Sequence, residues 1–265
     1  MWIRSELKSL AKTSLKGNYW KAFWISLVLA IVSGGGGSGG SSERVGEYIG
    51  RYPYETIVTI SIAIIILGIA FRLLLGYSLE IGSRKYFVNL SQFKNTDGCY
   101  SFAFDSPNYR GIIATMFLRD LYNFLWTLLF IIPGIVKGYS YLMVPYILAD
   151  NPNMGADNAI TLSRKMMDGN KADAFVLHLS FIGWYLLGLI AFVVGMFFVN
   201  PYFYATESQL YLVLRKKAID SGDCTYEDFN LQREINDIND INNYDNSNYN
   251  NNFKNEEDYF NRDDK

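Results

Sequence analysis

The feature that most constrains this sequence is a set of apolar runs too long for the core of a soluble protein. Residues 174–206 contain no Lys, Arg, Asp or Glu over 33 consecutive positions. A helix crosses the hydrocarbon layer with roughly 20 apolar residues at about 1.5 Å rise per residue, so this run predicts two membrane-spanning helices. We therefore expect a membrane protein, and a single water-soluble globular enzyme is excluded.

Similar charge-poor runs recur within the first 217 residues. Residues 19–33 lead into a Gly/Ser stretch that is typical of a flexible loop. Pro133 and Gly134 separate two runs and predict a turn, and Pro145 and Pro201 are expected to break or kink their helices because proline lacks the amide hydrogen. We expect an all-α polytopic membrane bundle of about six spans in three hairpins, at residues 19–33, 56–79, 111–132, 135–149, 174–190 and 192–214.

The distribution of Lys and Arg predicts the orientation of these spans. Segments rich in Lys and Arg alternate with segments that carry few of them. Because short cytoplasmic loops carry the excess, the alternation places both termini in the cytoplasm of a multi-pass cell-membrane protein. The start of the chain also fits a secretory signal. Its long basic region favours instead an amphipathic helix at the membrane surface, with Ile3, Leu7, Leu10, Ala11 and Leu15 on one face.

An internal repeat links two such interfacial helices. At an offset of 152 residues, Ser9–Phe23 aligns with Thr161–Phe175 with five identities in fifteen positions. Each copy contains Gly-Asn, at Gly17 and Gly169, just before a predicted span. Glycine tolerates a positive φ, so the pattern predicts a turn from the membrane surface into the bilayer. Coincidence between two apolar patterns is the alternative explanation.

Charged residues inside the predicted spans are the best functional candidates, because each costs roughly 2.5 kcal/mol or more at the bilayer centre. Arg72, Arg119 and Glu207 each lie about 12 Å from a cytoplasmic helix end at helical rise, and Asp120 is adjacent to Arg119. They predict a layer of charge in the cytoplasmic half. The layer fits an interhelical ion-pair network, a pocket for an anionic lipid phosphate, or a transport path through Glu207, Asp120 or Asp150.

No catalytic, metal or cofactor site is expected. The chain has no HExxH or P-loop pattern, and its single histidine, His178, is expected to be a packing residue. Cys99 and Cys224 fall on the predicted cytoplasmic side and are expected to be reduced thiols rather than a disulfide. The protein is therefore not expected to be an enzyme.

Residues 218–265 differ in kind from the rest of the chain. They hold 4 Lys and Arg against 13 Asp and Glu, a net charge of −9, whereas residues 1–217 hold 20 against 13. This Asn-rich segment is too polar to bury a core, so a disordered cytoplasmic tail is predicted. A solvated spacer and a docking segment both fit its composition, and its acidity argues against nucleic acid as a partner.

Several motifs of the membrane part carry a family resemblance. They are MFLRDL at 116–121, LFIIPG at 129–134, VPYILADNP at 144–152, LSRKMM at 162–167, LSFIGWYLLG at 179–188, RSELK at 4–8 and KGNYW at 16–20. These stretches resemble the bacterial integral membrane proteins of the "domain of unknown function 975" family over roughly residues 1–215. The resemblance implies a multi-pass plasma-membrane protein without a known activity, and it supplies no catalytic residue.

The expected function is a non-enzymatic one at the inner leaflet of the membrane. We expect the protein to bind or organise an anionic lipid or another amphiphile, with the lipid bilayer as its main partner. A transporter or permease for a small or amphiphilic solute is the first alternative. A structural or regulatory subunit of a membrane complex, with a membrane-protein partner, is the second.

Overall fold

The computed structural model describes residues 2–32, 53–190 and 194–231, and the regular elements in these ranges are helices, without a strand. The chain divides into two compact units, Met1–Asp223 and Cys224–Lys265. The described part of the second unit carries a short 3-10 helix, Glu227–Phe229. The predicted Gly/Ser loop and most of the predicted tail lie outside the described residues.

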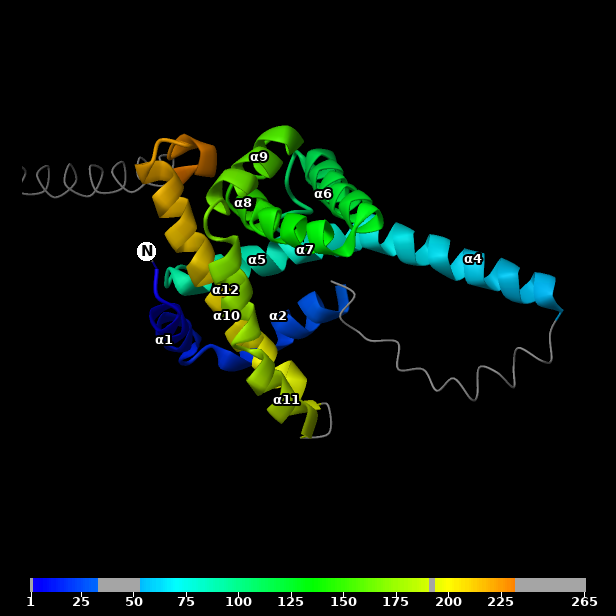
Figure 1. Ribbon diagram of the computed structural model, residues 1–265, viewed down its shortest axis with the longest axis horizontal. Coiled ribbons are helices and arrows are strands. Elements are labelled where there is room, and N and C mark those ends of the chain that lie inside the picture. The colour runs from blue at the N-terminus through cyan, green and yellow to red at the C-terminus, as the bar shows by residue number, and fades with distance from the viewer. Residues whose placement is uncertain (1, 33–52, 191–193, 232–265) are drawn as a thin grey trace, which may run out of the picture. The chain divides into compact units, whose positions relative to one another are not determined.

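The first unit is a bundle of helices (Figure 1). Its first half contains α1 (Arg4–Leu15), α2 (Tyr19–Val32), α4 (Tyr54–Phe71), the π-helical turn η1 (Arg72–Gly76) and α5 (Tyr77–Ser91). Its second half contains α6 (Tyr109–Leu129), α7 (Ile131–Ser140), α8 (Val144–Asp150), α9 (Ala156–Met166), α10 (Lys171–Leu179), α11 (Ile182–Ile190) and α12 (Val194–Asp220). The all-α prediction is confirmed for the described residues.

Three stretches in the described part of the chain are long and apolar enough to cross a membrane. They are Tyr54–Ser91, Tyr109–Leu129 and Ile131–Asp150, and a shorter apolar helix covers Tyr19–Ala30. The predicted span 174–190 is divided between α10 and α11, where the Ser180 hydroxyl donates to the Leu177 carbonyl at 2.5 Å. A side-chain bond of this kind competes with the helical ladder. The arrangement of six spans in three hairpins therefore stays a prediction.

The first of these stretches, Tyr54–Ser91, is exposed in its first half and buried in its second. Figure 1 shows α4 continuing into α5 as one long helix, 38 residues from Tyr54 to Ser91. The α4 half is apolar and none of its side chains is buried, whereas most of α5 is buried in the bundle. An apolar helix without protein neighbours needs an apolar solvent, so the surface of α4 suits lipid. The change in burial falls at η1, which begins at Arg72.

The turn between α6 and α7 lies three residues before the predicted position. We expected it at Pro133 and Gly134, but both are inside α7, and Phe130 is the extended residue with φ −156° and ψ 141°. The proline ring clashes with the carbonyl four residues earlier, and that residue is Leu129, where α6 ends. Proline thus breaks the helix upstream of itself and is tolerated in the first turn of the next one.

Gly134 has a packing role in this hairpin, since a Cβ added to it would lie 2.7 Å from the Thr127 Cα. Replacing Gly134 by alanine is expected to separate α6 from α7 and to destabilise the fold by about 1–3 kcal/mol. Gly183→Ala in α11 is the matched control, because its Cβ would meet no atom within 4 Å. Thermal unfolding of both purified variants measures the difference. Equal unfolding temperatures would contradict the packing role.

The other two prolines behave differently from each other. Pro145 is the second residue of α8, and α7 ends before Tyr141, four residues upstream, so a break accompanies it. Pro201 lies inside α12, which continues through it, so the expected break at this position is not observed. The Tyr19 hydroxyl donates to the Phe198 carbonyl at 2.8 Å, close to the point where Pro201 removes a backbone donor. This bond joins α2 to α12 one residue after the Phe197 carbonyl, which is the acceptor that Pro201 leaves without its helical donor.

The two copies of the internal repeat have the same backbone geometry. Gly17 and Gly169 both adopt positive φ, at 86° and 69°. The following residues, Asn18 and Asn170, donate their amides to the carbonyls three residues before them at 3.0 and 3.1 Å. In each copy the carbonyl of this asparagine then accepts the first hydrogen bond of the next helix. The predicted Gly-Asn turn between two helices is therefore present in both copies.

The apolar face of α1 is only partly what the sequence indicates. Leu7, Ala11 and Leu15 are buried, and α1 packs against α5 and α12. Ile3 and Leu10 were expected on the same face but are exposed. The buried stripe is narrower than the predicted one because the helix packs on other helices of the bundle along one line of contact.

One apolar core lies where α1, α2, α5 and α12 meet. Cys99, from the segment after α5, belongs to it, and its thiol accepts a hydrogen bond from the Asn89 amide at 3.5 Å. Burial raises the pKa of the Cys99 thiol, so it stays protonated at neutral pH. The buried members of this core are Ala11, Leu15, Ala22, Ile25, Tyr86, Phe87, Leu90, Cys99 and Ala205.

Candidate charged site and its cavities

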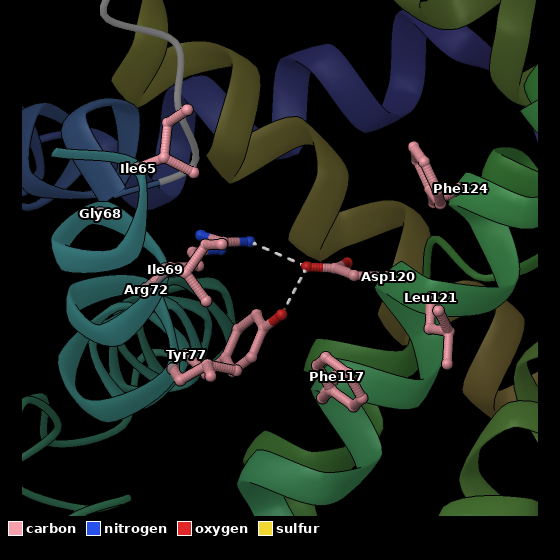
Figure 2. A pocket seen from close by; sticks show the side chains of 10 residues that line it. Ile65, Gly68, Ile69, Arg72, Tyr77, Phe117, Asp120, Leu121 and Phe124 are labelled. Atoms are coloured by element: carbon pink, nitrogen blue, oxygen red, sulfur yellow. Dashed lines mark hydrogen bonds and ion pairs between the residues drawn. The ribbon is translucent and has the colours of Figure 1, made fainter. Parts of the chain in front are cut away.

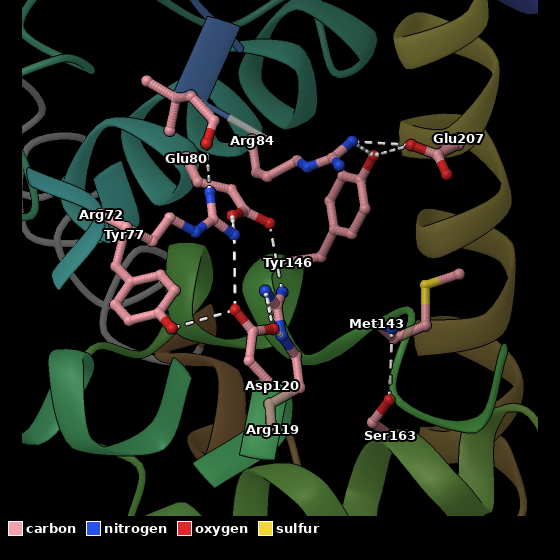
Figure 3. Close-up of polar contacts among 11 residues, drawn as sticks. Arg72, Tyr77, Glu80, Arg84, Arg119, Asp120, Met143, Tyr146, Ser163 and Glu207 are labelled. Atoms are coloured by element: carbon pink, nitrogen blue, oxygen red, sulfur yellow. Dashed lines mark hydrogen bonds and ion pairs between the residues drawn. The ribbon is translucent and has the colours of Figure 1, made fainter. Parts of the chain in front are cut away.

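The structure brings Arg72, Arg119 and Asp120 of the predicted charge layer together, and adds Glu80 to them. Arg72 lies 2.9 Å from Glu80 and 3.5 Å from Asp120. Arg119 lies 3.1 Å from Glu80 and 2.6 Å from Asp120. Each arginine therefore contacts both carboxylates, as Figure 3 shows. We call these four residues the ion-pair network.

The network connects several helices. Arg72 stands at the start of η1, Glu80 is on α5, and Arg119 and Asp120 are on α6. Arg72 also donates to the carbonyl of Val32, the last residue of α2, at 2.5 Å. A cation at a helix C-terminus is favoured by the helix dipole, so this contact fixes α2 to the network.

Glu207, the fourth predicted member, lies in a separate cluster. Its carboxylate is 2.6 Å from Arg84 Nη1 and accepts a hydrogen bond from the Tyr146 hydroxyl at 3.1 Å. The Tyr146 hydroxyl in turn accepts from Arg84 at 2.8 Å. His178 Nε2 lies 3.3 Å from the other oxygen of Glu207, and its Nδ1 lies 3.2 Å from the Tyr139 hydroxyl. We call Arg84, Tyr139, Tyr146, His178 and Glu207 the Arg84 cluster, and it joins α5, α7, α8, α10 and α12.

Asp150, the third acid considered for a transport path, is in a further cluster near the end of α12. It lies 2.6 Å from Arg215 and 3.8 Å from Lys85, and it accepts a hydrogen bond from the Tyr211 hydroxyl at 2.7 Å. The candidate acids therefore divide among three ion-paired clusters. This arrangement differs from the single layer that the sequence predicts.

Sequence reasoning missed Glu80 and Arg84 as members of the site. Both were placed in the loop after a span ending at residue 79, whereas α5 continues to Ser91 and buries them. Two signals pointed to a longer helix. Residues 72–91 contain no proline, and Glu80 and Arg84 are four residues apart, which places them on one helix face.

An open groove lies between α4 and α6 and ends at the ion-pair network. Its volume is about 480 Å³. Figure 2 shows Arg72 and Tyr77 pointing toward Asp120, with the Tyr77 hydroxyl donating to Asp120 at 3.0 Å. The remaining lining is mostly apolar, and the α4–α6 groove is made by Ile65, Gly68, Ile69, Arg72, Leu73, Tyr77, Phe117, Asp120, Leu121 and Phe124.

A smaller and more polar cavity lies on another side of the network. This chamber has a volume of about 220 Å³ and is lined by Glu80, Arg84, Arg119, Asp120, Asn123, Gly138, Tyr141, Leu142 and Pro145. A further pocket of about 350 Å³ shares Asn123, Gly138 and Leu142 with the chamber and reaches Tyr139 and His178. The groove and the chamber have Asp120 in common.

The chemistry of the site follows from its pairing. Two guanidiniums and two carboxylates make the ion-pair network electrically neutral. Glu80 is 5% exposed, whereas Asp120 is 37% exposed, so Asp120 is the carboxylate that a ligand in the groove can reach. Among the described residues, no three His, Cys, Asp or Glu side chains lie close enough to hold a metal ion.

Comparison with known proteins gives a family for part of the chain. Residues 128–218, from the end of α6 to the end of α12, match the family described as "Protein of unknown function (DUF975)". The resemblance seen in the motifs is therefore confirmed over these residues. No curated protein and no solved structure matches the chain.

Proposed function

We propose that the chain, whose residues 128–218 match the DUF975 family, is a multi-pass membrane protein that binds an amphiphile. The ligand lies in the α4–α6 groove. Its apolar part packs against the aliphatic and aromatic walls, and its head group meets Asp120 and Arg72. The observation that carries this proposal is the groove itself, which is apolar along its length and charged at one end.

The membrane setting is supported by the helix surfaces. The candidate span that contains α4 has no buried residue in its most apolar window. Exposed apolar side chains also cover the ends of α6 and α7, at Leu128, Leu129, Ile131 and Ile132. Such contiguous apolar surface is rare on soluble monomers. We retain six spans with both termini cytoplasmic, for which the alternation of Lys and Arg is the support.

The head group is inferred from the charge at the end of the groove. Because the ion-pair network has no net charge, an anionic phosphate would have to displace Asp120 from Arg72. That contact, at 3.5 Å, is the longest in the network. A head group with both a hydrogen-bond donor and an acceptor binds Asp120 and Arg72 without breaking it. We therefore favour an uncharged or zwitterionic head group over a purely anionic one.

Filling the groove tests the proposal. Leu121→Trp adds bulk to the α6 wall, and Leu128→Trp makes the same change about two turns farther along α6, where Leu128 is 73% exposed and outside the groove. The wild-type protein and Leu128→Trp are expected to retain a lipid through purification in mild detergent. Leu121→Trp is expected to lose at least about nine tenths of it. Native mass spectrometry measures the retained lipid.

The result has two readings once both variants are shown to be folded by circular dichroism. Loss of a defined lipid in Leu121→Trp alone supports a binding site in the groove. Equal lipid retention in all three proteins contradicts it, because the groove would then hold only exchangeable bilayer lipid.

Transport of a small or amphiphilic solute is a second candidate, favoured by the polar chamber behind Asp120. Asp120 lines both the groove and the chamber, so a head group that moves past this residue enters the bundle. Intramembrane charged residues commonly mark such paths. Glu207→Gln, in the adjoining Arg84 cluster, would then reduce transport into proteoliposomes and leave lipid retention in the groove unchanged.

A further inference from the structure

The chamber is a second cavity, separate from the α4–α6 groove in all its lining except Asp120. Its volume of about 220 Å³ leaves room for more than one water molecule. Two kinds of surface meet in it. Arg84, Arg119 and Glu80 present charged groups, whereas Leu142 and Pro145 present apolar ones.

Two polar atoms of the chamber residues have no hydrogen-bond partner among the residues that the structure describes. They are Arg84 Nε, a donor, and Asn123 Oδ1, an acceptor, and both atoms are buried. Arg84 is held in place by Glu207 and Tyr146, which bind its Nη1, whereas its Nε is buried without a partner. Buried polar atoms are satisfied in nearly all native proteins. The chamber therefore lacks one acceptor for Arg84 and one donor for Asn123.

The charges around the chamber restrict the ligand further. Two arginines and two carboxylates line it, and their formal charges cancel; they are Arg84, Arg119, Glu80 and Asp120. Their ion-pair partners outside the lining, Arg72 and Glu207, also balance each other. A ligand with a net charge would bring an uncompensated charge into a buried site, which is unfavourable. An uncharged ligand avoids this penalty.

We infer that the chamber binds a small uncharged molecule that presents one hydrogen-bond acceptor and one donor, with the primary amides as the simplest class. The amide carbonyl accepts from Arg84 Nε, and the amide N–H donates to Asn123 Oδ1. An alkyl group on the amide packs against Leu142 and Pro145. The neighbouring pocket of about 350 Å³, which shares Asn123, Gly138 and Leu142, provides the way in.

Three probe molecules of nearly the same size separate the contributions of the acceptor, the donor and the net charge to binding. Acetamide has the acceptor and the donor, acetone has the acceptor alone, and acetate has a net charge. Saturation-transfer NMR on the methyl protons measures their binding to the full-length protein in nanodiscs. Acetamide is expected to bind at least about fivefold more tightly than acetone, because acetone leaves Asn123 Oδ1 unpaired. Acetate is expected to bind more weakly than acetamide by a similar factor.

Two variants locate the binding. Asn123→Leu keeps the size of the side chain and removes the unpaired acceptor. Gly138→Val narrows the chamber, since even a Cβ at Gly138 would lie 3.3 Å from Asn123 Oδ1. This variant tests the same site if Asn123→Leu disturbs folding. Gly68→Val, on the groove side where a Cβ meets no atom within 4 Å, is the control. Acetamide binding is expected to fall at least fivefold in the first two variants and to persist in the third.

Equal binding of the three probes, or acetamide binding unchanged in both chamber variants, would overturn the inference and leave water as the occupant. This outcome is distinct from the failure of the proposed function. Lipid retention in the groove is tested by Leu121→Trp, and that result does not depend on the chamber.

Discussion

Replacing Arg84 with methionine should lower the free energy of unfolding by about 3–5 kcal/mol, which is the usual effect of removing one partner of a buried ion pair. Arg84 and Glu207 are 10% and 4% exposed and lie 2.6 Å apart. Methionine fills much of the same space, so the loss of stability reflects the missing charge more than lost packing. Without Arg84, Glu207 keeps the Tyr146 hydroxyl and His178 as its neighbours. The free energy can be measured by SDS titration in mixed micelles.

Two comparisons separate this effect from a general loss of positive charge. Arg164→Met removes an arginine from an exposed position on α9 and is expected to change the free energy of unfolding by less than about 1 kcal/mol. The double variant Arg84→Met with Glu207→Gln removes both charges and is expected to recover most of the lost stability. A double variant as unstable as Arg84→Met alone would show that the cluster is not an ion pair in energetic terms.

Much of the fold could be predicted because apolar runs are a local property of the sequence. The charge-poor segments around residues 56–79 and 111–132 coincide with α4 and α6. The end of the first segment was placed too early, at residue 79, because a hydropathy criterion ends a membrane span where charged residues begin. Glu80 and Arg84 continue the helix instead, and they are tolerated because partners from α6 and α12 neutralise them. Such pairing is a tertiary property that hydropathy does not contain.

The candidate site could be predicted in part for a similar reason. Depth along a helix follows from residue counting, and it predicts a common level for Arg72 and Arg119, which both contact Glu80 in the structure. Glu207 has the same estimated depth but faces Arg84. Depth says nothing about lateral position in the bundle, which depends on how helices pack. The cavities could not be predicted at all, because a cavity depends on where side chains from several helices fail to meet.

Replacing Glu80 with glutamine is the second change with a large expected effect, because Glu80 is the buried carboxylate that both Arg72 and Arg119 contact. The variant changes the ion-pair network from neutral to a net charge of +1. Two guanidiniums would then share Asp120, and the free energy of unfolding is expected to fall by about 3–5 kcal/mol. Asp120→Asn is the matched comparison, with a smaller expected loss because Asp120 is 37% exposed.

The same variant discriminates between the interpretations of the charge layer. If the arginines exist to bind an anionic phosphate, the extra positive charge in Glu80→Gln strengthens binding, and anionic lipid offered in excess should restore the lost stability. If the network serves to hold α2, α5 and α6 together, anionic and zwitterionic lipids should stabilise Glu80→Gln equally. We expect the second result, because Arg72 already donates to Glu80 and Asp120 within the network, so a negative charge on the lipid would have to compete with these carboxylates. Unfolding in nanodiscs of the two lipid compositions provides the measurement, and selective rescue by anionic lipid would contradict a purely structural network.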